Sequence, residues 1–268
     1  MMAQVRRLVA AMSAVALLAG ATACTKRPPL PPTGSVDADK FLFDRGSQAL
    51  QERHWLEARE YFRRLVDSYP NSQYRHEAKL GIGDSYLGED RVDTLILAAN
   101  EFREFLTYFP LNPRADYAQY RLAVAQMQQM LGPRRDQTAT IAALKEFDTF
   151  IENYPNSDLM PEVQKLRREV RDRLSESEFL IGRFHYNNRM YAGALGRLLP
   201  LLTDDPGYSH KDEVYFYLGE THMKIGRLAE ALPYYQRLLE EFPNSERADD
   251  ARKRIDEIKR GGGEGIKR

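Results

Sequence analysis

Apolar positions recur along this chain in blocks that each end in a proline. Twelve residues before the proline stands an alanine, four residues later a large apolar residue, and three residues later another large apolar residue. Residues at this spacing share one face of an α-helix, so each block predicts a helix that packs closely against a neighbour. The alanines are Ala58, Ala98, Ala143, Ala194 and Ala231.

The prolines mark where these helices end. They are Pro70, Pro110, Pro155, Pro206 and Pro243. Proline interrupts the helical hydrogen bonds, and the Asn-Ser pair that follows three of these prolines is a good cap for a following helix. We therefore predict a helix, a turn and a new helix at each of the five sites.

A second helix is expected before each alanine-bearing helix. Gly46, Gly182 and Gly219 each lie twelve residues before the alanine of their repeat. In the second repeat Gly83 lies fifteen residues before Ala98, and in the third repeat Ala123 replaces the glycine, twenty residues before Ala143. This Gly–Ala–aromatic–Pro order resembles the tetratricopeptide repeat. The expected repeats are 37–70, 72–110, 113–155, 157–206 and 209–243. The longer spacings predict lengthened turns at 88–93 and 132–138.

The predicted fold class is therefore all-α. It is a superhelical solenoid of about five tetratricopeptide repeats, closed by a C-terminal capping helix near 246–259 that covers the open end of the last repeat. The fourth repeat begins with an unusually long helix, from about Pro161 to Asn187, whose mixed charges at helical spacing are typical of a solvated face.

The first 23 residues have the pattern of a secretion signal. Arg6 and Arg7 precede an apolar run of thirteen residues, from Leu8 to Gly20, which is too short for a stable membrane-spanning helix of about 20 residues. Ala21-Thr22-Ala23 then stands before Cys24. This ending resembles a bacterial lipobox, with Ala21 in place of the usual leucine.

This ending allows two interpretations. It can be a plain Ala-x-Ala cleavage site followed by an incidental cysteine, or a lipobox. We favour the lipobox because Cys24 is the only cysteine, and an exported chain with one cysteine has no disulfide partner within itself. By resemblance to lipoproteins, Cys24 would carry a diacylglyceryl thioether and an N-acyl chain such as palmitate, and Thr25 favours the outer membrane.

The remaining boundaries follow from composition. Four prolines within 25–36 predict an extended tether that holds the folded part off the lipid surface. The expected organisation is a leader at 1–23, the lipidated cysteine and tether at 24–36, the repeat domain at 37–260 and a flexible tail at 261–268.

Charge and chemistry narrow the function classes. Basic and acidic side chains number 39 each, and removal of Arg6 and Arg7 with the leader leaves 37 against 39, so nothing predicts nucleic-acid binding. The five histidines lack metal-ligand spacing, and the Gly81-Ile82-Gly83 stretch lacks a third glycine and a preceding strand. We therefore predict no catalytic residue, no metal and no cofactor other than the lipid on Cys24.

The first helices of the repeats offer a binding face. An apolar or aromatic residue lies three positions before and another lies four positions after each repeat's glycine or Ala123. Residues at this spacing share one helix face. They can fill the core between helices, or line a groove for an extended or helical peptide. The groove candidates are Phe43, Leu50, Leu80, Leu87, Tyr120, Met127, Phe179 and Tyr186, with the aromatic Phe43, Tyr120 and Tyr186 preferred.

Several stretches then carry a resemblance to a known family. They are Tyr108-Phe109-Pro110-Leu111-Asn112-Pro113 with Asp116-Tyr117 and Tyr120-Arg121; Arg135-Asp136 leading to Tyr154-Pro155-Asn156-Ser157; and Arg173-Leu174 with Glu178-Phe179 and Arg183-Phe184. With five repeats behind a lipobox, the chain resembles the BamD family of lipoproteins of the outer-membrane β-barrel assembly machine. The resemblance covers nearly the whole mature chain.

The resemblance implies a periplasmic scaffold anchored to the outer membrane, not an enzyme. Its C-terminal repeats would hold the periplasmic domain of the barrel-forming assembly subunit, with Arg197 and Arg237 tuning that docking. Its N-terminal repeats would receive unfolded outer membrane protein precursors, and other assembly lipoproteins are further expected partners. The alternative is an envelope adaptor lipoprotein for cell-division (Tol-Pal), pilus-secretin or competence systems. An enzyme acting on peptidoglycan is disfavoured by the lack of a catalytic set.

Overall fold

The computed structural model describes the backbone of residues 37–264 and the side chains as far as residue 260. The predicted leader, Cys24 and tether lie outside the described residues. All elements of the described range are α-helices. They are α2 (Ala38–Gln51), α3 (Trp55–Ser68), α4 (Arg75–Glu89), α5 (Val92–Tyr108), α6 (Ala115–Met127), α7 (Thr138–Asn153), α8 (Met160–Asn187), α9 (Tyr191–Asp204), α10 (Lys211–Lys224), α11 (Leu228–Glu241) and α12 (Ala248–Glu264).

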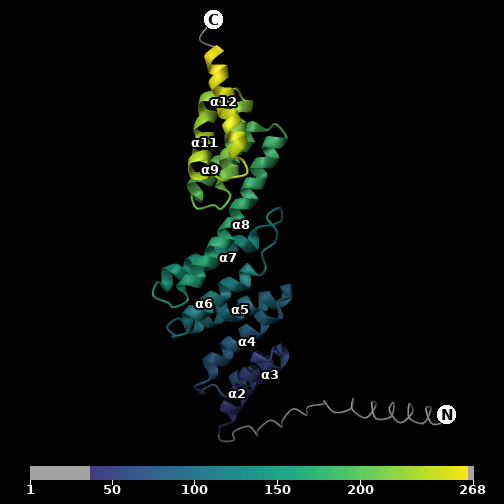
Figure 1. Cartoon of the computed structure of the whole chain (residues 1–268). Helices are drawn as coiled ribbons and strands as arrows, with labels where there is room; N and C mark the ends of the chain where they lie inside the picture. Colours follow the sequence, from purple (N-terminus) through teal and green to yellow (C-terminus); the bar gives the residue numbers. More distant parts are fainter. Residues whose placement is uncertain (1–36, 265–268) are drawn as a thin grey trace, which may run out of the picture.

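The helices stack in chain order as an elongated array, with α2 and α3 at one end and α12 at the other (Figure 1). Each helix packs mainly on the helix before it and the helix after it, as expected of a solenoid. The pairs α2–α3, α4–α5, α6–α7, α8–α9 and α10–α11 are the five repeats, and α12 caps the last. The predicted all-α repeat fold is confirmed.

The alanine-bearing face of each second helix faces inward. All five alanines are fully buried, and so are the large residues four positions later: Phe62, Phe102, Phe147, Leu198 and Tyr235. The repeat glycines Gly46, Gly83, Gly182 and Gly219 each admit one of these side chains. A Cβ added to Gly46 would lie 2.6 Å from the Phe62 ring, and one added to Gly219 would lie 2.6 Å from Tyr235. The small residues are therefore needed for the close approach of the two helices.

The serines of the Asn-Ser pairs have two roles. As predicted, their hydroxyls serve the start of the next helix: Ser72 accepts a hydrogen bond from the backbone N–H of Tyr74 (3.1 Å) just before α4, and Ser157 accepts one from Leu159 (3.2 Å) just before α8. The Ser72 hydroxyl donates a hydrogen bond to Asp39 at the start of α2 (2.6 Å), and Ser157 donates to Asp116 of α6 (2.7 Å). Ser245 bonds to an aspartate of α10 in the same way. Each serine thus links the start of the following helix to the beginning of the preceding repeat.

One of the two predicted long turns is wrong. Helix α4 continues to Glu89 and α5 begins at Val92, so the extra residues of repeat two lengthen α5 instead of the turn. The Thr94 hydroxyl accepts a hydrogen bond from the backbone N–H of Arg91 (3.2 Å), which helps α5 to start at Val92. The second prediction is confirmed, because α6 ends at Met127 and α7 begins only at Thr138.

Helix α8 links the two halves of the molecule. Its first part packs with α6 and α7 through Val163 and Val170, whereas its second part packs with α9 and α10 through Phe179. Its 28 residues confirm the predicted long helix. Because one continuous helix belongs to both clusters, it fixes the orientation of the two halves relative to each other.

The C-terminal boundary also differs from the sequence prediction. Helix α12 begins at Ala248 and ends at Glu264, so the predicted flexible tail at 261–268 overlaps its last turn. Residues 265–268 lie outside the described part of the chain. The apolar face of α12 buries Ala248, Ala251, Ile255 and Ile258 against α10 and α11, which is the predicted capping role.

Candidate functional site

A groove lies between α6 and the first part of α8, two first helices of neighbouring repeats. It encloses about 480 Å³ and has a floor of apolar residues with charged residues at the rim. Its apolar lining includes Tyr120, Val124, Met127, Met130 and Leu166, and its rim carries Glu162, Glu169 and Arg173. We call this the central groove. Burial raises the pKa of Tyr120, which therefore presents a neutral hydroxyl.

A second hollow of about 410 Å³ continues from the central groove along α8. The two share Glu169 and Arg173, and the second hollow extends to Phe179, Arg183 and the beginning of α10. Together they form a track that passes from an apolar end to a more polar end. A track of this kind suits an extended segment better than a compact small molecule.

The eight predicted groove residues divide into four groups, of which the fourth is the core pair Leu80 and Leu87. Tyr120 and Met127 lie together in the central groove. Phe179 lines the second hollow but is only 2% exposed. Phe43, Leu50 and Tyr186 are partly buried against the helix-packing clusters.

Leu80 and Leu87 are corrections to the predicted groove. They are 2% and 3% exposed and belong to the core cluster of α2–α6. Both lie on the helix face that the neighbouring repeats cover, so a ligand cannot reach them in this conformation. The Phe43 ring also packs within the protein, because it stacks on the Tyr74 ring with centroids 5.0 Å apart.

The predicted docking arginines lie on second helices. Arg197 of α9 donates a hydrogen bond to Glu178 of α8 (3.1 Å) and stays half exposed. It lines a pocket of about 420 Å³ with Ile141 and Arg171. Arg237 is exposed on α11, well along the chain from this pocket. The structure thus gives Arg197 a concave and partly apolar setting, which Arg237 lacks.

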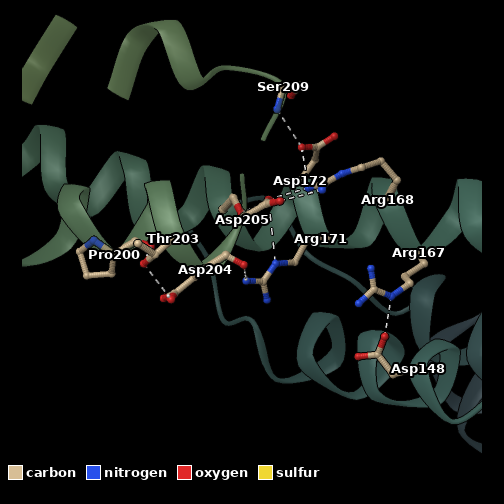
Figure 2. Close-up of polar contacts among 11 residues, drawn as sticks. Asp148, Arg167, Arg168, Arg171, Asp172, Pro200, Thr203, Asp204, Asp205 and Ser209 are labelled. Atoms are coloured by element: carbon tan, nitrogen blue, oxygen red, sulfur yellow. Dashed lines mark hydrogen bonds and ion pairs between the residues drawn. The ribbon is translucent and has the colours of Figure 1, made fainter. Parts of the chain in front are cut away.

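Within repeat four, a polar junction ties the end of α9 to the middle of α8 (Figure 2). Arg168 donates to both carboxylate oxygens of Asp205, at 2.7 and 2.6 Å, and Ser175 donates to the same group at 2.6 Å. Arg171 donates to the backbone oxygen of Asp204 (2.6 Å). Asp205 is 3% exposed, and it occupies the position where the other repeats have tyrosine or phenylalanine. The sequence shows that Asp205 replaces the aromatic residue of the repeat pattern, but it does not show which residues of α8 bind Asp205.

Replacing Asp205 with asparagine should lower the free energy of unfolding by about 2–3 kcal/mol, because the Arg168 guanidinium would then face amide hydrogens. The value lies below that of a fully buried pair because Arg168 is 37% exposed. Chemical denaturation followed by circular dichroism measures this change. The matched control is Asp204→Asn, since the Asp204 side chain is exposed, and a similar loss in the control would contradict the assignment.

The junction should also be sensitive to acid. Burial alone would raise the pKa of Asp205, but hydrogen bonds from Arg168 and Ser175 outweigh burial and hold that pKa below its ordinary value of 3.8. A lowered folded-state pKa gives stabilisation that is complete above the ordinary value and lost as the pH falls through the lower one. The Asp205→Asn variant should therefore lose less stability than wild type below about pH 4.

A buried carboxylate organises the last repeat. Glu220 of α10 is 5% exposed and accepts hydrogen bonds from three other helices. The donors are Tyr186 of α8 (3.2 Å), Tyr235 of α11 (2.8 Å) and the guanidinium of Arg254 of α12 (2.5 and 3.1 Å). Burial and Glu220 together raise the pKa of Tyr235. Nothing in the repeat pattern singles out Glu220 in the sequence.

The described residues contain neither a metal-binding cluster nor a membrane-spanning helix. Within 37–264, no group of three or more histidine, cysteine, aspartate or glutamate side chains is placed to hold a metal ion. None of the helices in this range combines the length and apolar character that a membrane span requires. Cys24, the predicted lipidation site, lies outside the range, so its role remains a prediction.

Comparison with known proteins gives a consistent family. Residues 36–232 match the family model YfiO, described as outer membrane lipoprotein. The chain is 29% identical over 224 residues to the outer membrane protein assembly factor BamD of Caulobacter vibrioides, covering 83% of this chain and 72% of that protein. It is 24% identical to BamD of Haemophilus influenzae, covering 74% of this chain and 79% of that protein.

Solved structures with a similar arrangement have low sequence identity. The TPR2AB domain of yeast Sti1, in complex with an Hsp90 peptide, aligns with a TM-score of 0.47 at 11% identity, covering 84% of each chain. The MamA protein aligns with a TM-score of 0.34 at 15% identity, covering 80% of this chain and 95% of that one.

Proposed function

This chain belongs to the YfiO family of outer membrane lipoproteins, and from that premise we propose that it is a non-catalytic assembly factor for outer membrane β-barrel proteins. Its curated relatives carry the name outer membrane protein assembly factor BamD. The proposal assigns the repeats a scaffold role: they hold an unfolded precursor and a partner subunit at the same time.

The central groove is the observation that carries this proposal. An unfolded β-barrel precursor is an extended chain whose apolar residues alternate with polar ones, so it needs an apolar floor with polar groups alongside. The groove supplies both, with Met127 and Leu166 in its floor and Glu169 and Arg173 at its rim. Each large apolar side chain that a precursor buries there contributes about 1.5–3 kcal/mol before ordering costs.

The location refines the expectation from the sequence. The precursor site expected on repeats one and two is better supported on α6 and α8, because Leu80 and Leu87 are core residues and Tyr120 and Met127 line an open groove. The pocket around Arg197 and Ile141 lies between α8 and the second helices α7 and α9. We propose it as the docking site for the periplasmic domain of the barrel-forming subunit, where charge tunes the association rate and its salt dependence.

The anchor proposal concerns Cys24. Conversion of Cys24 to alanine should abolish incorporation of a fatty-acid label, because the thiol and the new amino group are the sites of lipidation in this class of protein. Metabolic labelling with a fatty acid followed by immunoprecipitation measures this. Cells expressing the matched variant Thr25→Ala should still incorporate label. Label that persists in the Cys24 variant would show that the lipid is attached elsewhere.

Purification of the native lipoprotein from detergent-solubilised envelopes, followed by mass spectrometry, tests the function itself. The proposal predicts the barrel-forming assembly subunit and unfolded barrel precursors among the specific partners. Recovery of a secretin or of Tol-Pal proteins in their place would support the envelope-adaptor alternative instead. A chain with Tyr120→Ala and Met127→Ala should lose the precursors and keep the subunit.

A further inference from the structure

A fourth pocket lies away from the central groove, between the α6–α7 connection and the last turns of α8. It encloses about 460 Å³. Three arginines surround it, Arg134 and Arg135 from the connection and Arg183 from α8, and its apolar lining is Leu180, Ile181 and Phe184. We call it the arginine pocket. Nothing in the proposed scaffold role uses it.

The charges of this pocket are not neutralised within the protein. Among the described residues, no carboxylate forms an ion pair with the side chains of Arg134, Arg135 or Arg183, although Arg183 lies over the Phe179 ring at 5.4 Å. In contrast, Arg167 and Arg168 on the same α8 pair with Asp148 and Asp205. The pocket therefore leaves positive charge available for an anionic ligand.

The turn that follows α8 adds another arginine in a costly backbone conformation. Arg189 has φ of 60°, and Arg53 at the corresponding turn of repeat one has φ of 61°, whereas repeat five has Gly226 with φ of 78° there. Glycine adopts this left-handed conformation without the clash that a side chain causes. The Arg189 side chain is exposed two residues after Asn187, which lines the pocket, so it adds a further positive charge to this end of α8.

Exposed apolar side chains accompany these arginines. Phe184 is 60% exposed, and Leu131 and Met190 are exposed on the connections next to it. A phosphate ion would account for the arginines but not for the apolar residues. A lipid surface accounts for both, because guanidinium groups bind anionic headgroups while apolar side chains enter the boundary with the acyl chains.

We propose that the arginine pocket and the α8–α9 turn contact anionic phospholipid on the membrane to which this outer membrane lipoprotein is attached. The contact orients the array, so that the α6–α7 connection and the end of α8 face the lipid. This inference rests on membrane association and not on what occupies the central groove.

A label at the turn tests this orientation in the intact lipoprotein. Met190→Cys, labelled with bimane and reconstituted in vesicles, should be quenched by brominated acyl chains when the vesicles contain phosphatidylglycerol. Quenching should be weaker in phosphatidylcholine alone and should fall at high salt. The control label is Leu111→Cys, because Leu111 is 96% exposed on a turn between repeats and away from the arginine pocket. Unmodified wild type shows whether Cys24 takes up label.

Charge removal supplies the second test. Each arginine close to an anionic surface strengthens binding by about fivefold. The variant Arg134→Gln, Arg135→Gln and Arg189→Gln should therefore weaken the contact about 100-fold and reduce quenching to the level in phosphatidylcholine. A control with the same charge change uses the exposed Arg103, Lys145 and Arg237. Equal quenching of both labels, or no quenching with phosphatidylglycerol, would overturn the proposal.

Discussion

Replacing Glu220 with alanine should cost the last repeat about 3–5 kcal/mol of stability, because it removes a carboxylate that links four helices. The loss leaves the buried Tyr235 hydroxyl without its acceptor and the Arg254 guanidinium without its main partner. Arg254 can still bond to Glu257, which places the expected value near the lower end of this range. Helix α12 depends most on this contact, so it should be the first element to loosen.

Hydrogen exchange measures the loss where it arises. In a repeat array, stability is approximately a sum over neighbouring units, so a defect at one end need not unfold the other. Amide protection in α11 and α12 should fall by at least about 100-fold, while protection in α4 and α5 stays unchanged. Glu257→Gln is the matched control, since Glu257 contacts the same arginine from an exposed position. Equal losses in the two variants would contradict the central role of Glu220.

Removing the groove's two predicted anchors should abolish most precursor binding. The double variant Tyr120→Ala and Met127→Ala should weaken binding of a C-terminal barrel peptide by about 100-fold, because two large side chains each contribute about 1–3 kcal/mol at such a site. Binding of the barrel-forming subunit's periplasmic domain should be unchanged. Two calorimetric titrations on the same preparation measure the two affinities.

The control for this variant lies on another face of the array. Ile96 and Leu97 are exposed on α5 and take no part in the central groove, so Ile96→Ala with Leu97→Ala should leave both affinities unchanged. A loss of both affinities in the groove variant would indicate a general folding defect. Full peptide binding by the groove variant would show that Tyr120 and Met127 only pack the core.

The fold could be predicted because its rules are local. The alanine of each second helix and the large residue four positions later repeat at fixed spacing, and close helix packing requires that order of sizes. The errors in the fold concern where helices end. The residues around Gly88 extend helices and α12 continues to Glu264, and the spacing of prolines predicts neither outcome.

The site was only partly predictable, because helical periodicity shows which face a residue shares but not what covers that face. Leu80 and Tyr120 occupy equivalent positions, yet the neighbouring repeats bury the first and leave the second beside an open groove. Long-range polar contacts were invisible for the same reason. Asp205 departs from the repeat pattern, but only the packing of repeat four shows that Arg168 and Ser175 bind it.

Site-specific photo-crosslinking in living cells tests the central claim most directly. A photoreactive amino acid in place of Met127 should crosslink to newly exported barrel precursors, and the yield should fall when their synthesis is stopped. The same amino acid in place of the exposed Ile96 should not capture them. Capture of precursors at Ile96 but not at Met127, or of folded periplasmic proteins alone at Met127, would contradict the claim that the central groove receives unfolded barrel proteins.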